Sequence, residues 1–138
     1  MGTADRAGRD DWYGVRMRLP ASDDALRAAR RFAAQVTAEA GQERLVDDVT
    51  LLAAELTTNA VLHGTGPIAL TVWTDGDLVR LEVEDGAAAM PSRLDAQADQ
   101  ERGRGLEIVE GLADQWGAAR LEGNGKVVWA ELRGDGGK

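Results

Sequence analysis

The chain has no cysteine and a single histidine, His63. Without cysteine there can be no disulfide, no thiolate metal site and no thiol catalysis. With one histidine, we expect neither a histidine-based metal cluster nor a Ser-His-Asp triad. The sequence also lacks a long apolar run and a signal-peptide pattern, which predicts a cytoplasmic protein.

Positive charge is also scarce, because 16 Lys and Arg stand against 24 Asp and Glu, giving a formal net charge of −8. Binding to nucleic acids or anionic membranes depends on clustered cations, so we expect neither direct nucleic-acid binding nor membrane binding. Local clusters of arginine leave room for local anion sites. They comprise Arg27, Arg30 and Arg31, and then Arg102 and Arg104.

A length of 138 residues and a hydrophobic fraction of 43% are typical of one folded domain. Residues 1–11, rich in Gly, Asp and Arg, are predicted to be disordered, and residues 134–138 to form a flexible tail. Residues 12–133 then form the domain, and no repeat or linker divides them.

Two helices are predicted where apolar residues recur with the helical period. The first begins at an N-cap residue, either Ser22 or Asp23, and ends before Gly41. The second covers residues 43–63, with Gly64 placed to cap its C-terminus.

Alternating residues predict five strands, at 12–20, 68–74, 78–84, 116–121 and 126–133. A third helix is expected at 105–115, after a long segment without a sustained period. Asp75-Gly76-Asp77 is a strong hairpin-turn signal between the second and third strands. The order of elements predicts an α+β fold, a two-layer sandwich with three helices on one face of a mixed, mostly antiparallel sheet.

The second helix carries Asn59 within its apolar stripe, with Glu55 on the edge of the stripe four residues earlier. In one interpretation Asn59 satisfies a nearby backbone carbonyl and Glu55 points to solvent, which is the common outcome for such residues. In the other, a buried amide needs a partner, and an amide oxygen beside a carboxylate suits a hard cation such as Mg²⁺.

Two further features follow this helix in the sequence. The third strand ends in Asp85-Gly86, which places a carboxylate at the mouth of the sheet. The third helix begins with the run Gly103-Arg104-Gly105-Leu106, and glycines at a helix start let backbone N–H groups approach an anion closely. A lone Gly-x-Gly is weak evidence for a ligand site. The Glu55–Asn59 pair, the strand-end Asp85, the long segment after it and the Gly-x-Gly helix start, in this order, are much stronger evidence.

At these residues the sequence resembles the Bergerat-fold, or GHKL, ATPases. Residues 55–64 (ELTTNAVLHG) resemble the N box of that family, Asp85-Gly86 the first glycine box, and residues 103–109 (GRGLEIV) the second. Residues 112–117 (LADQWG) are similar to a pattern of the small stand-alone anti-sigma-factor serine kinases. The resemblance covers residues 15–133 and implies the Bergerat two-layer fold.

The resemblance implies a role for each residue of the N box and the first glycine box. Asn59 would coordinate the Mg²⁺ that bridges the phosphates of ATP. Glu55 would act as general base toward the attacking hydroxyl or water. Asp85, followed by Gly86, would accept a hydrogen bond from the adenine amino group.

The second glycine box would bind the phosphates through Gly103, Gly105 and Leu106. Arg104 would either neutralise phosphate charge or face solvent, and both interpretations stay open. Residues 87–102 would form the ATP lid. His63 is interpreted as a structural residue at a helix end, favoured there by the helix dipole.

Three departures from the family pattern bear on nucleotide affinity. Ala87 and Ala89 stand where many relatives have glycine, and they limit the backbone conformations of the turn. Val127 stands where a threonine often supports adenine binding through water. The lid also has fewer glycines than is typical.

The resemblance implies an ATP-dependent protein serine/threonine kinase that acts as an anti-sigma factor. Its partners would be a sigma factor and a STAS-type anti-sigma-factor antagonist, and a homodimer formed through the sheet is a further expectation. The alternatives are a nucleotide-binding regulatory protein without kinase activity and a degenerate scaffold without nucleotide. A histidine kinase is disfavoured because no phosphoacceptor helix is recognisable.

Overall fold

The computed structural model describes residues 12–20, 22–87, 107–122 and 125–134. Residues 107–112 are helical and lie between β3 and β4 in the sequence. The other elements are β1 (Tyr13–Leu19), α1 (Ala25–Glu39), a 3₁₀ turn η2 (Glu43–Leu45), α2 (Val46–His63), β2 (Ile68–Asp75), β3 (Leu78–Asp85), β4 (Gln115–Arg120) and β5 (Lys126–Arg133).

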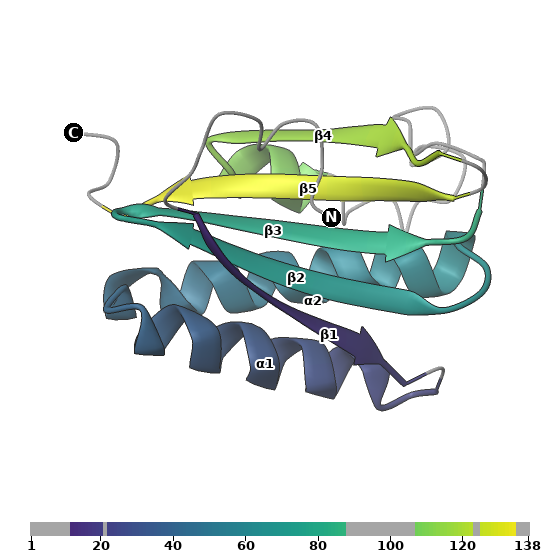
Figure 1. Ribbon diagram of the computed structural model, residues 1–138, viewed down its shortest axis with the longest axis horizontal. Helices are drawn as coiled ribbons and strands as arrows, with labels where there is room; N and C mark the ends of the chain where they lie inside the picture. Colours follow the sequence, from purple (N-terminus) through teal and green to yellow (C-terminus); the bar gives the residue numbers. More distant parts are fainter. Residues whose placement is uncertain (1–11, 21, 88–106, 123–124, 135–138) are drawn as a thin grey trace.

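The five strands form one sheet in the order β1-β2-β3-β5-β4 (Figure 1). Each neighbouring pair is antiparallel, so the expectation of a mixed sheet was wrong in that respect. The reason is that β5 enters between β3 and β4 and pairs with both in the antiparallel sense. The predicted α+β class with a two-layer arrangement is confirmed.

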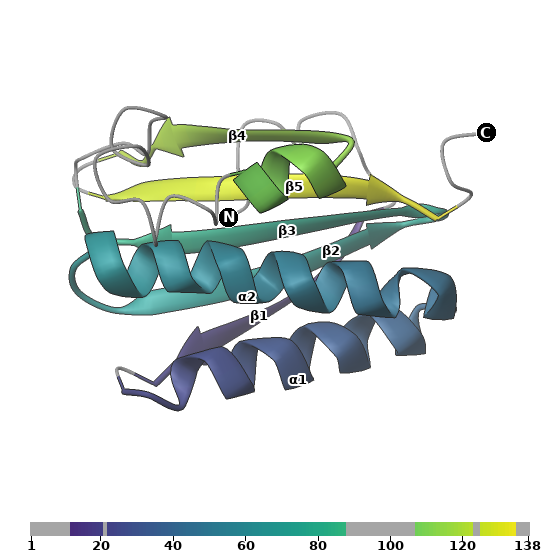
Figure 2. The ribbon, with the colours of Figure 1, turned by 180° about the vertical axis from the view of Figure 1, so that it is seen from behind.

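The helices cover one face of the sheet, as Figure 2 shows for α1, α2 and the helical residues 107–112. Strand residues that point to this face alternate along the chain and pack with the apolar stripes of the helices. The buried core includes Ala29 and Ala33 of α1, Leu52 and Leu56 of α2, Val109, and Leu70, Leu81, Val83 and Val128 of the sheet.

The predicted helices are present with shifted ends. Asp24, rather than Ser22 or Asp23, is the N-cap of α1, and its backbone N–H donates to the Ser22 hydroxyl at 3.2 Å. Gly41 follows α1 with φ of 80°, the left-handed conformation that glycine adopts without strain. The first residues expected in the second helix form η2 instead.

The third helix ends at residue 112, earlier than the predicted residue 115. Asp114 already belongs to the sheet edge, because its N–H donates to the carbonyl of Glu131 at 2.8 Å. Its carboxylate also accepts the N–H of Arg133 at 2.8 Å. These long-range bonds to β5 override the local helical pattern.

The sheet face opposite the described helices carries a buried charge cluster. Arg80 donates through Nε to Glu82 at 2.8 Å and through Nη1 to Glu131 at 2.7 Å. Its guanidinium lies 4.1 Å from the centre of the Trp129 ring. Arg80 and Glu82 are each 1% exposed, although they lie on the face opposite the described helices.

The ends of the domain differ in part from the expectation. Gly134, predicted to start the flexible tail, is buried, and its N–H donates to the carbonyl of Asp77. Trp12, just before β1, is also buried and packs edge-on against Trp73, with ring centroids 6.5 Å apart. Residues 1–11 and 135–138 lie outside the described residues.

Candidate functional site

Two of the predicted site residues lie on α2, one turn apart. Glu55 and Asn59 are both half-buried, at the edge of the face that packs on the sheet. The stripe itself consists of fully buried neighbours such as Leu52 and Leu56. Asn59 therefore borders the apolar stripe, whereas the sequence placed it within the stripe. Both side chains can reach a ligand without losing all contact with water.

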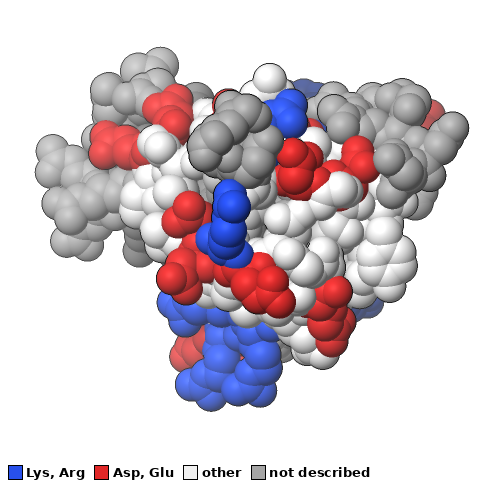
Figure 3. Space-filling view, turned by 90° about the vertical axis from the view of Figure 1, so that its left-hand side faces the viewer, with Lys and Arg blue, Asp and Glu red and all other residues white. Residues whose placement is uncertain are grey.

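Burial raises the pKa of the Glu55 carboxyl above its ordinary value, and the nearby guanidinium of Arg30 opposes this shift by lowering the pKa. A carboxyl with a raised pKa is a stronger proton acceptor, which suits a general base. Exposed cations lie on α1, which packs beside α2. They are Arg27, Arg30 and Arg31, and Lys and Arg side chains gather at the lower edge of the molecule in Figure 3.

Among the described residues, the amide of Asn59 makes no hydrogen bond. Its neighbour Thr58, in contrast, donates its hydroxyl to the carbonyl of Ala54 at 2.8 Å. An amide oxygen at this position suits a hard cation, which fits Mg²⁺.

The third site residue, Asp85, ends β3 and is 4% exposed. Its Oδ1 accepts the backbone N–H of Ala87 at 2.7 Å. Gly86 donates its own N–H to the carbonyl of Thr65 at 2.6 Å. No described residue other than glycine has a positive φ, so Ala87 fits this turn without strain.

Gly64 joins the two parts of the site, because it follows α2 directly and lies against Asp85. A Cβ on Gly64 would lie 2.6 Å from Cγ of Asp85 and 2.5 Å from the carbonyl oxygen of Ala60. Only glycine allows this close approach. The end of the helix that carries Glu55 and Asn59 is thereby placed against the carboxylate at the end of β3.

Lys126 is the site residue that the sequence analysis missed. Its Nζ lies 3.0 Å from Oδ1 of Asp85, and the two side chains are only 3% and 1% exposed. Val127, which stands in place of the supporting threonine, does not face Asp85. In the register, Asp85 pairs with Lys126, whereas Val127 pairs with Glu84 and points to the opposite face.

The other predicted site residues, Gly103, Arg104, Gly105 and Leu106, lie outside the described residues. Residues 88–102 of the lid predicted over residues 87–102, including Ala89, also lie outside them. His63, at the end of α2, is exposed, as a structural residue in the last helical turn can be.

Within residues 12–20, 22–87, 107–122 and 125–134, no group of three or more His, Asp and Glu side chains could hold a metal ion. A cation at Asn59 would therefore take most of its ligands from the bound molecule and from water. In the same part of the chain, no helix has the length and apolar character needed to cross a membrane.

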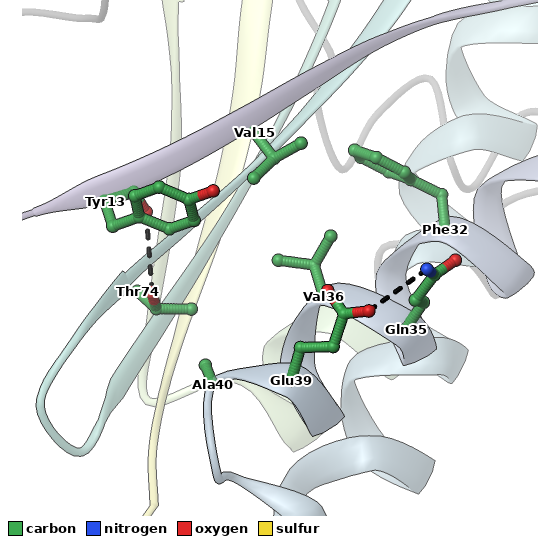
Figure 4. Close-up of a pocket in the computed structure, with 8 residues that line it drawn as sticks. All are labelled: Tyr13, Val15, Phe32, Gln35, Val36, Glu39, Ala40 and Thr74. Carbon is green, nitrogen blue, oxygen red and sulfur yellow. Dashed lines mark hydrogen bonds between the residues drawn. The ribbon is translucent and has the colours of Figure 1, made fainter.

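A cleft between β1 and the C-terminal half of α1 lies apart from these residues (Figure 4). Its polar groups are already engaged with each other, since Gln35 donates to Glu39 at 3.2 Å. None of the predicted site residues lines it. Its lining comprises Tyr13, Val15, Phe32, Gln35, Val36, Glu39, Ala40 and Thr74.

Comparison with known proteins identifies the family of the domain. Comparison with curated proteins found no match. A family model described as the histidine kinase-like ATPase domain matches residues 19–132. The match begins at the last residue of β1, includes α1, α2, β2, β3 and β4, and ends one residue before the end of β5. The match spans most of the chain, and the protein therefore belongs to the histidine kinase-like ATPase domain family and carries an ATP-binding domain.

Proposed function

We propose that this domain binds ATP with Mg²⁺ and transfers the γ-phosphoryl group to a serine or threonine hydroxyl of a protein partner. The observation that carries the proposal is the arrangement of Glu55, Asn59 and Asp85. The first two lie one turn apart on α2, and Gly64 holds the end of that helix against the third. This order suits a proton acceptor, a cation ligand and a base-reading carboxylate along one bound nucleotide.

In this proposal Asn59 would hold Mg²⁺ together with the phosphates. The cation would supply neutralisation of negative charge on the transferring group. Glu55 accepts the proton of the partner hydroxyl as the new oxygen–phosphorus bond forms. The bond between the γ-phosphorus and the β–γ bridging oxygen breaks, and ADP leaves. Burial, which raises the pKa of Glu55, strengthens it for this step.

The proposed partners are a STAS-type antagonist, which supplies the hydroxyl, and a sigma factor, so that the chain acts as a cytoplasmic anti-sigma factor. A surface beside Glu55 supports a protein partner. Leu51 and Leu62 share its side of α2 and are 42% and 38% exposed. Exposed leucines next to a proton acceptor favour a protein substrate over a small molecule.

The test is phosphate transfer to a purified STAS-domain antagonist in the presence of ATP and Mg²⁺, followed by mass spectrometry. Glu55→Gln should reduce the transfer rate by about 100-fold or more, the usual effect of losing a general base. Asp47→Asn, which removes an exposed acid from the same helix, is the matched control and should retain the rate. Equal rates for wild type and Glu55→Gln would refute the assignment.

A second candidate is a protein that binds nucleotide to shape a partner surface and transfers no phosphate. It is favoured by Arg30, whose charge lowers the pKa of Glu55 and so opposes proton acceptance. In that case wild-type protein would bind the antagonist in an ATP-dependent manner and leave it unphosphorylated.

A further inference from the structure

A lysine on a central strand, on the face covered by helices, is unusual because lysine is rarely buried without a partner. Lys126 is the first residue of β5, which pairs with β3 on one side and β4 on the other. The alternation of β5 places it on the same face as the core residues Val128 and Ala130. Its side chain is 3% exposed.

The ammonium group of Lys126 has three N–H donors. Among the described residues, its hydrogen-bond acceptor is Oδ1 of Asp85, at 3.0 Å. Oδ1 also accepts the N–H of Ala87. A buried charge is stable only when its remaining hydrogen-bonding capacity is met, so the two other donors call for further acceptors.

The surrounding backbone holds this pair in place. Gly125, which precedes Lys126, has φ of 105°, and a Cβ there would lie 2.6 Å from the carbonyl oxygen of Asp85. The backbone at the start of β5 therefore packs closely against the backbone at the end of β3. The carboxylate and the ammonium form a fixed acceptor beside a fixed donor.

Adenine presents the complementary pattern. Its amino group donates, and the ring nitrogens on either side of it, N1 and N7, accept. We propose that Lys126 is a second base-reading residue, which donates to one of these ring nitrogens while Asp85 accepts from the amino group. This inference rests on the proposed function, in which Asp85 meets adenine. The Asp85–Lys126 ion pair remains intact when the nucleotide binds, so neither buried charge loses its partner.

Calorimetric titration of wild-type protein with ATP, 1-deaza-ATP and 7-deaza-ATP tests the proposal, because each analogue removes one ring nitrogen. One analogue should bind about tenfold more weakly than ATP, the effect of losing a hydrogen bond to a charged donor. Similar dissociation constants for ATP and both analogues would overturn the role of Lys126. If wild-type protein binds neither ATP nor the analogues, the proposed function fails along with this inference.

The variant Lys126→Met, with its fold checked by circular dichroism, completes the test. It should bind ATP more weakly and lose the discrimination between ATP and the sensitive analogue. Arg133→Met removes an exposed cation from the same strand and should retain the discrimination. Unchanged discrimination in Lys126→Met would assign Lys126 a structural role alone. If Lys126→Met does not fold, Lys126→Arg keeps the charge but moves the donor, and the discrimination should still fall.

Discussion

Gly64 lies so close to Asp85 that a methyl group on the glycine would come within 2.6 Å of Cγ of the carboxyl group. This contact connects α2, which carries Glu55 and Asn59, to the end of β3. The helix and the strand are therefore fixed relative to each other at the site. The spacing between Glu55 and Asp85 therefore depends on this single small residue.

Gly64→Ala should therefore lower the free energy of unfolding by about 1–3 kcal/mol, the usual cost of an overpacked contact. It should also weaken ATP binding, because Asp85 must move. Urea denaturation and calorimetry measure the two effects. Gly111→Ala is the control, since a Cβ at Gly111 meets no atom within 4 Å. Equal stability of Gly64→Ala and wild type would contradict the close contact.

Asn59→Ala should weaken ATP binding in the presence of Mg²⁺ by at least about tenfold, as disturbing a metal site usually does. Without Mg²⁺, the variant and wild type should bind ATP alike, because the amide acts through the cation. Thr58→Ala, one residue away, is the control. A loss that is the same with and without Mg²⁺ would show that Asn59 does not act as a metal ligand.

The raised pKa of Glu55 predicts a pH-dependent stability effect. Because the folded state holds the proton more tightly than the unfolded state, the contribution of Glu55 is fully present below its unfolded pKa. It is lost as the pH rises through the folded pKa. The stability of Glu55→Gln relative to wild type should therefore increase between about pH 4 and about pH 8.

Denaturation curves across this pH range measure that difference. Glu39→Gln, which removes an exposed carboxylate from α1, controls for the general loss of a negative charge. If the difference between Glu55→Gln and wild type stays constant over the range, burial does not raise the pKa of Glu55.

The charge cluster of Arg80, Glu82 and Glu131, on the sheet face opposite the described helices, predicts a large stability effect. Arg80→Met deprives the buried Glu82 and the half-buried Glu131 of their shared cation. The expected loss is about 3–5 kcal/mol, as for other broken buried ion pairs. The triple variant Arg80→Met, Glu82→Gln and Glu131→Gln should recover part of it, since no buried charge is left without its cation. Urea denaturation that shows a loss below about 1 kcal/mol for Arg80→Met would argue against the cluster.

Local sequence patterns predicted the elements well because their periods are strong. The bounds of β5 agree with the prediction, and α2 ends at His63 as expected. The antiparallel sheet order was not predictable in the same way. The insertion of β5 between β3 and β4 depends on pairing between residues far apart in the sequence, which no local period encodes.

The candidate site could be named from the sequence where chemistry and period coincide, as at Glu55 and Asn59, which lie one turn apart on α2. Lys126 was missed, although the alternation of β5 contains the signal. Val128, Ala130 and Leu132 define the core face, and the same period places residue 126 on it. A charged residue in that register indicates a buried partner, and the register supplies Asp85.

The most direct test of this account is a calorimetric titration of the wild-type protein with ATP, with and without Mg²⁺. The account predicts binding that Mg²⁺ strengthens. Absence of binding at millimolar ATP in the presence of Mg²⁺ would contradict it, and Asn59, Asp85 and Lys126 would then require a purely structural explanation.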